Sequence, residues 1–337
     1  MRVFLYEWAT GGGLVDQPGA LPESLLCEGA AMLGALAADF VRIEGCHVTV
    51  LRDMRVIDLA LPGVEIIDVQ SKPVHDEHFA NQACQADGTM VIAPEFDRIL
   101  ESTAVAVELA NGTLWSPPPK FVRLTASKQR TAEKLASADI PVPEAMLLAP
   151  EDKPPQDFFY PAVIKPIDGA GSQDTQLVTA PHDEPLPYHE PRRLERYYTG
   201  LPVSVAVICG WGVRHFLPPC EQVLSSDGRF RYHGGRLPLP SGMAVRATTL
   251  AEQVVSALPY ANGYFGIDMI LGREADGTED VVIEVNPRLT TSYVCLRAAA
   301  KNHLAAAIVD VHRGQATAFE FSDQPLEFDT KGHVSYL

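Results

Sequence analysis

Three consecutive prolines at positions 117–119 divide this chain of 337 residues into parts with different local patterns. Proline has no backbone N–H and restricts the residue before it, so the segment Trp115–Lys120 breaks regular structure and marks a domain boundary. Strand-like and helix-like stretches alternate before this segment, whereas hairpins predominate beyond residue 150. The chain therefore combines more than one architecture.

The N-terminal third has the pattern of an α/β domain. Leu25–Ile43 carries apolar residues at near-helical spacing, and Phe96–Leu109 is a second helical stretch. Apolar or β-branched runs predict strands at Val3–Tyr6, His47–Leu51, Val64–Val69 and Thr89–Ala93. Strands that alternate with helices predict a mostly parallel sheet covered on both faces.

The remainder of the chain has the pattern of an α+β protein, with several consecutive antiparallel strands. The predicted strands are Val203–Ile208, Arg214–Val223, Arg229–Tyr232, Tyr264–Leu271 and Asp280–Val285. The predicted helices are Lys128–Ala138, Ala247–Leu258 and a long final helix, Tyr293–His312.

A lysine followed closely by a loop of small residues is the first candidate site. An apolar strand leads to Lys165, and Gly169, Gly171 and Ser172 follow it. Glycines let backbone N–H groups approach an anion closely, and the lysine adds a point charge. The segment outlines a phosphate site, although it matches neither common phosphate-loop motif. By themselves these residues fit equally well a lysine that precedes an ordinary turn.

Polar side chains at the ends of two apolar strands form the second candidate site. Glu284 and Asn286 point to the same side of one strand, and Asp268 lies within the preceding strand of a predicted hairpin. A carboxylate inside an apolar strand needs a counter-charge. Two carboxylates and an amide suit Mg²⁺, and Arg288 could stabilise a developing negative charge. The alternative is a salt-bridged hairpin with polar residues on one face.

A third segment, Arg192–Val205, contains Glu195, Arg196 and Tyr198. These residues could contact the edge of an adenine through a carboxylate and the backbone. Taken alone, the segment is typical of a strand that enters a turn.

The order of these segments resembles that of the ATP-grasp superfamily over residues 120–313. The matching motifs are Lys128, Ile-Pro-Val-Pro143, Val-Ile-Lys165-Pro, Glu195–Gly200, Phe-Gly-Ile-Asp268 and Ile-Glu284-Val-Asn286-Pro-Arg288. The resemblance implies α/β and α+β architecture, with ATP held between two α+β subdomains of an ATP-grasp fold. It also implies a Rossmann-like pre-ATP-grasp α/β domain at residues 1–116, a small subdomain at 117–192 and a C-terminal subdomain at 193–337.

The resemblance also implies a role for each motif residue. Lys128 and Lys165 would contact phosphates, the loop Asp168–Ser172 would close over them, and Glu195 with the backbone near Arg196 and Tyr198 would hold adenine. Asp268, Glu284 and Asn286 would hold one or two Mg²⁺ ions, which Mn²⁺ could replace. The expected catalytic residues are Lys165 and Arg288, the latter stabilising an acylphosphate. Pro202 stands where many relatives have an acidic residue for the ribose.

A narrower resemblance involves Glu7–Gly13, Glu28–Asp39, Ile92–Glu95 and Asn286–Tyr293. These segments look like those of the tyramine–glutamate ligases of methanofuran biosynthesis, which have a counterpart in the methylofuran pathway. The implied reaction joins the γ-carboxylate of glutamate to tyramine or tyrosine and releases ADP and phosphate. The candidate substrate residues are Glu7, Gly12, Glu28, Thr290, Thr291 and Ser292, with Glu95 as a further carboxylate for the amine.

Three other functions share the same motifs. Another ATP-grasp ligase, which makes a dipeptide or polyglutamate, would differ only in its acceptor. A phosphotransferase would release a stable phosphorylated product, and a catalytically silent nucleotide-binding module would release none. The intact set of Asp268, Glu284, Asn286 and Arg288 argues against a silent module. For Glu7, Glu28 and Glu95 the alternative is a charge at a helix end or sheet edge, and the glycines at 11–13 could belong to a dinucleotide site.

Composition excludes several classes of partner. The net charge of −16 argues against a duplex-binding protein, because neutralising phosphates needs a basic face. The six scattered cysteines indicate reduced thiols, and no apolar run approaches the roughly 20 residues of a membrane span. A cytoplasmic protein without a signal segment is expected, and a homodimer is left open. His75 and His78 are interpreted as part of a solvated surface.

Overall fold

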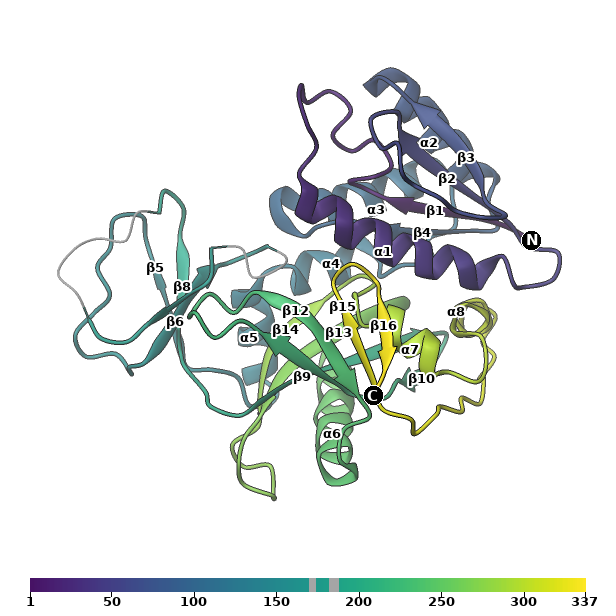
Figure 1. Cartoon of the computed structure of the whole chain (residues 1–337). Helices are drawn as coiled ribbons and strands as arrows, with labels where there is room; N and C mark the ends of the chain where they lie inside the picture. The colour runs from purple at the N-terminus through teal and green to yellow at the C-terminus, as the bar shows by residue number, and fades with distance from the viewer. Residues whose placement is uncertain (170–173, 182–187) are drawn as a thin grey trace.

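The computed structural model describes residues 1–169, 174–181 and 188–337. Three sheets organise these residues: a parallel sheet near the N-terminus, a small antiparallel sheet, and a large sheet formed mainly by the C-terminal half (Figure 1). In the part of the chain that is described, no helix is long and apolar enough to cross a membrane.

The N-terminal sheet is parallel, with strand order β3-β2-β1-β4, as the alternation of strands and helices predicts. Its strands are β1 (Arg2–Glu7), β2 (His47–Asp53), β3 (Glu65–Val69) and β4 (Gly88–Ile92), and its helices are α1 (Glu23–Phe40), α2 (Lys72–Gln85) and α3 (Ile99–Leu109).

Alternate residues of β1 anchor the helices on both faces of this sheet. Val3 and Leu5 pack in the core that contains α1, whereas Phe4 and Tyr6 pack in the core that contains α2 and α3. Successive side chains of a strand point to opposite faces, so an unbroken apolar strand is what a doubly covered sheet requires.

The proline segment leads directly into the next helix. Helix α4 (Pro119–Thr125) starts at the third proline, and α5 (Lys128–Ala136) follows it with Ser127 as its capping residue. Proline is tolerated in the first turn of a helix, where its missing N–H has no intrahelical partner. The expected break in regular structure is therefore shorter than Trp115–Lys120.

The small sheet is antiparallel, with strand order β5-β8-β6-β7. Its strands are β5 (Ala145–Leu148), β6 (Ala162–Pro166), β7 (Gln176–Val178) and β8 (Arg192–Arg196). Strand β8 crosses the boundary expected between residues 192 and 193, and its partners β5 and β6 both lie in this sheet. We therefore propose that the division between the second and third domains falls after Arg196.

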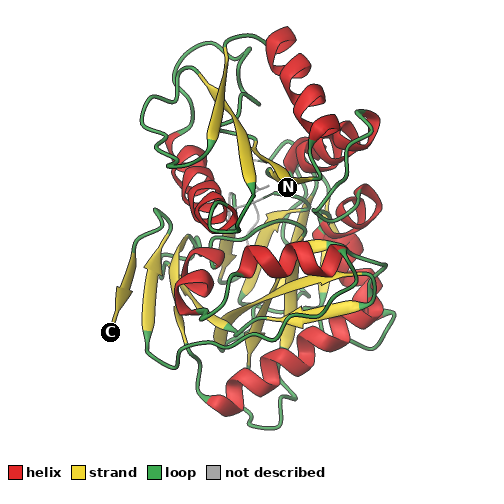
Figure 2. Cartoon of the chain, turned by 90° about the vertical axis from the view of Figure 1, so that its right-hand side faces the viewer, coloured by secondary structure: helices red, strands yellow, loops and turns green. Residues whose placement is uncertain are grey.

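The large sheet supports the remaining helices. Its strands are β9 (Leu201–Gly210), β10 (Val213–Phe216), β11 (Cys220–Leu224), β12 (Tyr232–Leu237), β13 (Gly263–Leu271), β14 (Val281–Asn286), β15 (Leu326–Asp329) and β16 (Val334–Tyr336). Val205 and Val207 of β9 pack with α6 (Ser241–Ala257), whereas Ala206 and Ile208 share a core with α7 (Tyr293–Ala299) and α8 (Leu304–His312). Helices therefore cover both faces of the sheet (Figure 2).

Three predicted elements were wrong. The segment Arg214–Val223 forms two strands, β10 and β11, and Arg229–Tyr232 contributes only its last residue to β12. The predicted helix Tyr293–His312 is divided into α7 and α8. Ala300 forms an isolated bridge with Phe321, and the N–H of Lys301 donates to the carbonyl of Glu320, so a remote segment takes the backbone groups that a continuous helix would use.

The prediction that His75 lies on a solvated surface was also wrong. Helix α2 was not predicted, and it buries the His75 ring beside the N-terminal sheet. His75 Nε2 lies 2.9 Å from Tyr6 Oη, and Nδ1 lies 2.9 Å from Asp76 Oδ1. Burial lowers the pKa of His75 below its usual 6.5, although Asp76 opposes the shift.

This burial predicts a pH-dependent loss of stability. The unfolded chain binds a proton at His75 more readily than the folded chain, so the stabilising contribution of neutral His75 is present above pH 6.5 and is lost as the pH falls below it. Thermal denaturation at pH 7.5 and 5.5 should show a smaller acid-induced loss for His75→Gln than for the unmodified protein. His78→Gln, in the same helix, should behave like the unmodified protein; an undiminished acid effect in His75→Gln would contradict this assignment.

Candidate active site

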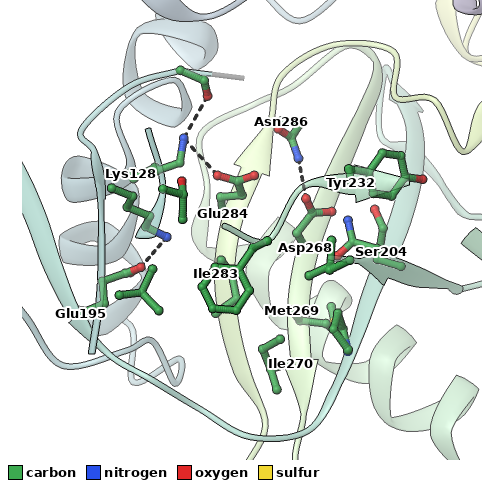
Figure 3. Close-up of a pocket in the computed structure, with 18 of the residues that line it drawn as sticks. Lys128, Glu195, Ser204, Tyr232, Asp268, Met269, Ile270, Ile283, Glu284 and Asn286 are labelled. Atoms are coloured by element: carbon green, nitrogen blue, oxygen red, sulfur yellow. Dashed lines mark hydrogen bonds and ion pairs between the residues drawn. The ribbon is translucent and has the colours of Figure 1, made fainter. Parts of the chain in front are cut away.

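A cavity lies between the small sheet and the large sheet, and it contains most of the predicted site residues (Figure 3). Strands β6 and β8 form one wall, and β13 and β14 form the opposite wall. The predicted residues that line it are Glu28, Lys128, Lys165, Gly169, Glu195, Arg196, Tyr198, Asp268, Glu284, Asn286, Arg288, Thr290, Thr291 and Ser292. Gly171 and Ser172 lie outside the described residues.

Lys165 and Glu195 form a buried ion pair on the first wall. Lys165 is 5% exposed and Glu195 is 3% exposed, and they come from the adjacent strands β6 and β8. Glu195 also accepts a hydrogen bond from Arg193 Nε at 3.2 Å. The carboxylate therefore orients two buried cations.

Lys128 connects this wall to the opposite one. It begins α5, donates a hydrogen bond to the Gly169 carbonyl at 2.9 Å, and pairs with Glu284 Oε2 at 3.0 Å. Burial lowers the pKa of Lys128, but Glu284 and neighbouring carboxylates more than offset this effect, so the net shift is upward. The lysine is held in its charged form at the start of the predicted phosphate loop.

Asp268 and Glu284 face each other on adjacent antiparallel strands. They are register partners of β13 and β14, and Asn286 Nδ2 donates to Asp268 Oδ2 at 3.0 Å. Burial and the charge of Glu284 raise the pKa of Asp268 to about 6. For Glu284, burial raises the pKa, but Lys128 and Lys165 outweigh it and the net pKa is lowered.

The chemistry of this pair fits a divalent cation. Asp268 Oδ1 is buried, and it has no hydrogen-bond partner among the described residues. A buried carboxylate oxygen without a partner is costly unless a ligand satisfies it. The described residues contain no group of three or more His, Cys, Asp or Glu side chains that could hold a metal alone. Mg²⁺ is commonly bound by one or two carboxylates together with substrate phosphates, so Asp268, Glu284 and Asn286 suit it.

Arg288 lies where the N-terminal domain meets this cavity. Its Nε is 2.9 Å from Glu95 Oε1, and Glu95 follows β4 and is 4% exposed. Glu28 of α1 lines the same cavity; burial raises its pKa, and Arg288 opposes the shift. Beside them, Thr290 Oγ1 and Ser292 Oγ are 2.8 Å apart.

Glu7 and Gly12 occupy a different environment and do not line the described cavity. The Glu7 carboxylate accepts hydrogen bonds from the N–H groups of Ala9 and Thr10 and from the Thr10 hydroxyl. Gly12 has φ +99°, and a Cβ there would lie 2.6 Å from a methyl group of Val69. The contacts of these two residues hold the turn after β1.

Several polar residues of the cavity were not predicted from the sequence, among them Ser204, Gln222 and Tyr232. Ser204 is the register partner of Asp268 across β9 and β13. No local pattern marks these residues, because the strand pairing that brings them to Asp268 joins distant parts of the chain.

Two family models match the chain. An ATP-grasp domain matches residues 125–292, and a pre-ATP-grasp domain matches residues 46–122. The chain therefore belongs to the ATP-grasp superfamily, and it has the ATP-grasp fold with an N-terminal parallel α/β pre-ATP-grasp domain. ATP-grasp enzymes are generally ATP-dependent carboxylate–amine ligases, and ATP-grasp domains typically bind ATP with Mg²⁺. A comparison with curated proteins finds no match.

Solved structures of low sequence identity share the fold. An ATP-grasp superfamily protein from Archaeoglobus fulgidus has a TM-score of 0.71 at 20% identity, covering 98% of this chain and 92% of that one. N5-carboxyaminoimidazole synthetase from Staphylococcus aureus, complexed with ADP, has a TM-score of 0.69 at 15% identity, with coverages of 97% and 81%. An L-amino acid ligase from Bacillus licheniformis has a TM-score of 0.66 at 16% identity, with coverages of 97% and 78%.

The buried position of Lys165 predicts its contribution to nucleotide binding. Lys165→Met should raise the dissociation constant for ATP about tenfold or more, because a hydrogen bond to a charged group is worth about 1.5–3 kcal/mol. Titration calorimetry with ATP and Mg²⁺ measures the change, and thermal denaturation checks that the variant folds. Lys301→Met, at a surface lysine paired with Glu320, is the matched control. Unchanged affinity in Lys165→Met would remove Lys165 from the phosphate site.

Proposed function

We propose that this chain is an ATP-dependent carboxylate–amine ligase that joins the γ-carboxylate of glutamate to an aromatic amine, tyramine or tyrosine. The observation that carries the reaction class is the contact between the two walls of the cavity. Lys128 reaches Glu284 at 3.0 Å, so the lysines of one wall lie beside the carboxylates of the other. This arrangement supports binding of the triphosphate between the walls.

In the proposed first step, a carboxylate oxygen of glutamate attacks the γ-phosphorus of ATP. The bond to the bridging oxygen breaks, ADP leaves, and an acylphosphate forms. Lys128 and Lys165 orient the phosphates and offset their charge throughout. A Mg²⁺ ion, when held by Asp268, Glu284 and Asn286, supplies further charge compensation between the phosphates.

In the second step, the neutral amine attacks the acylphosphate carbonyl. The amide forms as phosphate leaves, and the nitrogen loses a proton. Arg288 stabilises the negative charge that develops on the carbonyl oxygen and on the departing phosphate. Thr290, Thr291 and Ser292 line the cavity next to Arg288 and orient the carboxylate substrate through their hydroxyls.

The residues around Arg288 support the choice of substrates. Glu28 and Glu95 lie near Arg288, and carboxylates at this point suit an ammonium group. The segments that carry these residues, Glu28–Asp39 and Ile92–Glu95, resemble the tyramine–glutamate ligases. The fold shared with an L-amino acid ligase supports an amino acid as one substrate. Pro202 lines the cavity and offers no polar side-chain atom to the ribose.

Glu284→Gln tests the reaction. With glutamate, an aromatic amine, ATP and Mg²⁺ present, turnover should fall about 100-fold or more, comparable to the loss of one preorganised electrostatic group. Release of ADP measures the rate, and mass spectrometry identifies the amide. Glu274→Gln, at an exposed position of the β13–β14 turn, should retain full activity.

Other outcomes of this experiment would contradict the proposed function or indicate a different one. Undiminished turnover in Glu284→Gln would remove the metal-site assignment. A stable phosphorylated product would indicate a phosphotransferase, and an amide formed from other amino acids would indicate a different ligase of this superfamily. Nucleotide binding without any amine-dependent release of ADP would indicate a silent module.

A further inference from the structure

A second cavity lies next to the nucleotide site and is lined by arginines. It has a volume of about 460 Å³, within the range of small-molecule sites. Its walls come from the segment between β4 and α3, from α4, and from the start of α5. The charged residues that line it are Glu95, Arg98, Glu101, Arg123, Arg130 and Asp168. Asp168 lines both cavities, so the two sites adjoin.

A buried carboxylate organises two of these arginines. Glu101 is 4% exposed, and it accepts hydrogen bonds from Arg98 Nε at 2.9 Å, Arg98 Nη2 at 3.1 Å and Arg123 Nε at 2.6 Å. The buried carboxylate thereby orients both guanidinium groups, although the side chains of Arg98 and Arg123 are 71% and 54% exposed. Donors that are already oriented lose less side-chain freedom when they bind an anion.

The arginines that line this cavity have N–H donors beyond those used in these hydrogen bonds. Each guanidinium has five N–H donors, and the structure gives acceptors, within the described ranges, for only some of them. Arg130 donates from Nη1 to the Arg123 carbonyl at 3.3 Å. Arg98 and Arg123 share the single carboxylate of Glu101, and among the described residues the other two carboxylates of the lining, Glu95 and Asp168, form no ion pair with the three arginines.

The backbone is strained at the wall of the cavity that carries Arg98. Asp97 and Arg98 are consecutive non-glycine residues in the left-handed region, with φ 53° and 58°. Such conformations persist where surrounding contacts enforce them, and they concentrate at ligand-binding sites. Here the turn places Arg98 at the rim of the cavity, where its guanidinium group forms hydrogen bonds with Glu101.

Glu95 is a second buried carboxylate of this cavity, and it is paired with Arg288. Its Oε1 pairs with Arg288 Nε at 2.9 Å, and among the described residues its Oε2 has no hydrogen-bond partner. Its remaining lone pairs suit a donor such as an amine. The cavity therefore offers a carboxylate paired with Arg288 and a separate group of three arginines.

We infer that this cavity binds the acceptor amine and that the amine carries an oxyanion, a carboxylate or a phosphate. The amine nitrogen lies at Glu95 beside Arg288, and the oxyanion lies against Arg98, Arg123 and Arg130. This inference rests on the proposed ligase function and narrows its acceptor. Of the two amines considered above, it selects the one with a carboxylate, tyrosine, over tyramine.

Steady-state kinetics with three amines tests the inference: tyramine, tyrosine and tyramine O-phosphate, each with glutamate, ATP and Mg²⁺. The unmodified enzyme should prefer one of the two anionic amines to tyramine, and which of them it prefers identifies the oxyanion. Arg130→Ala should raise the KM for that amine about 10-fold or more, because it removes a charge-assisted hydrogen bond. The KM values for ATP and for tyramine should not change.

Two further variants separate binding from structural damage. Arg123→Ala should have the same selective effect, and Arg130→Lys should restore part of the affinity. Arg231→Ala, at an exposed arginine elsewhere, is the matched control. A preference for tyramine in the unmodified enzyme, or equal KM changes for charged and uncharged amines in Arg130→Ala, would overturn the inference.

Failure of the proposed function gives a different result. If no amine yields an amide, the ligase assignment fails, and the cavity is then tested by thermal denaturation alone. A rise in the melting temperature with an anionic amine but not with tyramine, abolished in Arg130→Ala, would still support the site. No such rise would overturn it.

Discussion

Opposite charges buried together in one cleft are the constraint on which this structure depends. Three ion pairs meet there: Lys165 with Glu195, Lys128 with Glu284, and Arg288 with Glu95. Each pair joins different elements, and the last joins different domains. An unpaired charge in such a position would be strongly destabilising. The pairs therefore hold the walls of the cavity together. In the proposed function, the same cations compensate the charge of the triphosphate.

The N-terminal domain completes the site rather than merely covering it. Asp39 of α1 is 2% exposed, and it accepts hydrogen bonds from the Tyr293 hydroxyl at 2.8 Å and from Arg297 Nε at 3.0 Å. These contacts hold α1 against α7. Glu28, three turns earlier on α1, is thereby held where it lines the cavity between the small and large sheets. The contact between the two domains and the position of Glu28 in the cavity thus depend on the same helix.

Elements with strong local periodicity could be predicted from the sequence. The parallel strands before residue 94 and helices α1 and α6 were found near their observed places, because their burial patterns follow the strand and helix periods. Helix α2 was missed because its sequence is polar with only a few buried residues, among them His75 and Phe79. The break between α7 and α8 was missed because it depends on pairing with Glu320 and Phe321, which local propensity does not report.

The sequence by itself determined the order of the motifs, the superfamily, and the residue types able to bind phosphate and metal. Spacing along β14 placed Glu284 and Asn286 on one side of a strand, which needs only the two-residue period. Only the tertiary structure decided which charges pair. Lys128 meets Glu284, and Glu95 meets Arg288, across separations that no local rule spans. It also gathered Arg98, Arg123 and Arg130 around buried Glu101, because close packing of the β4–α3 segment against α4 and α5 brings together residues that are unremarkable in sequence.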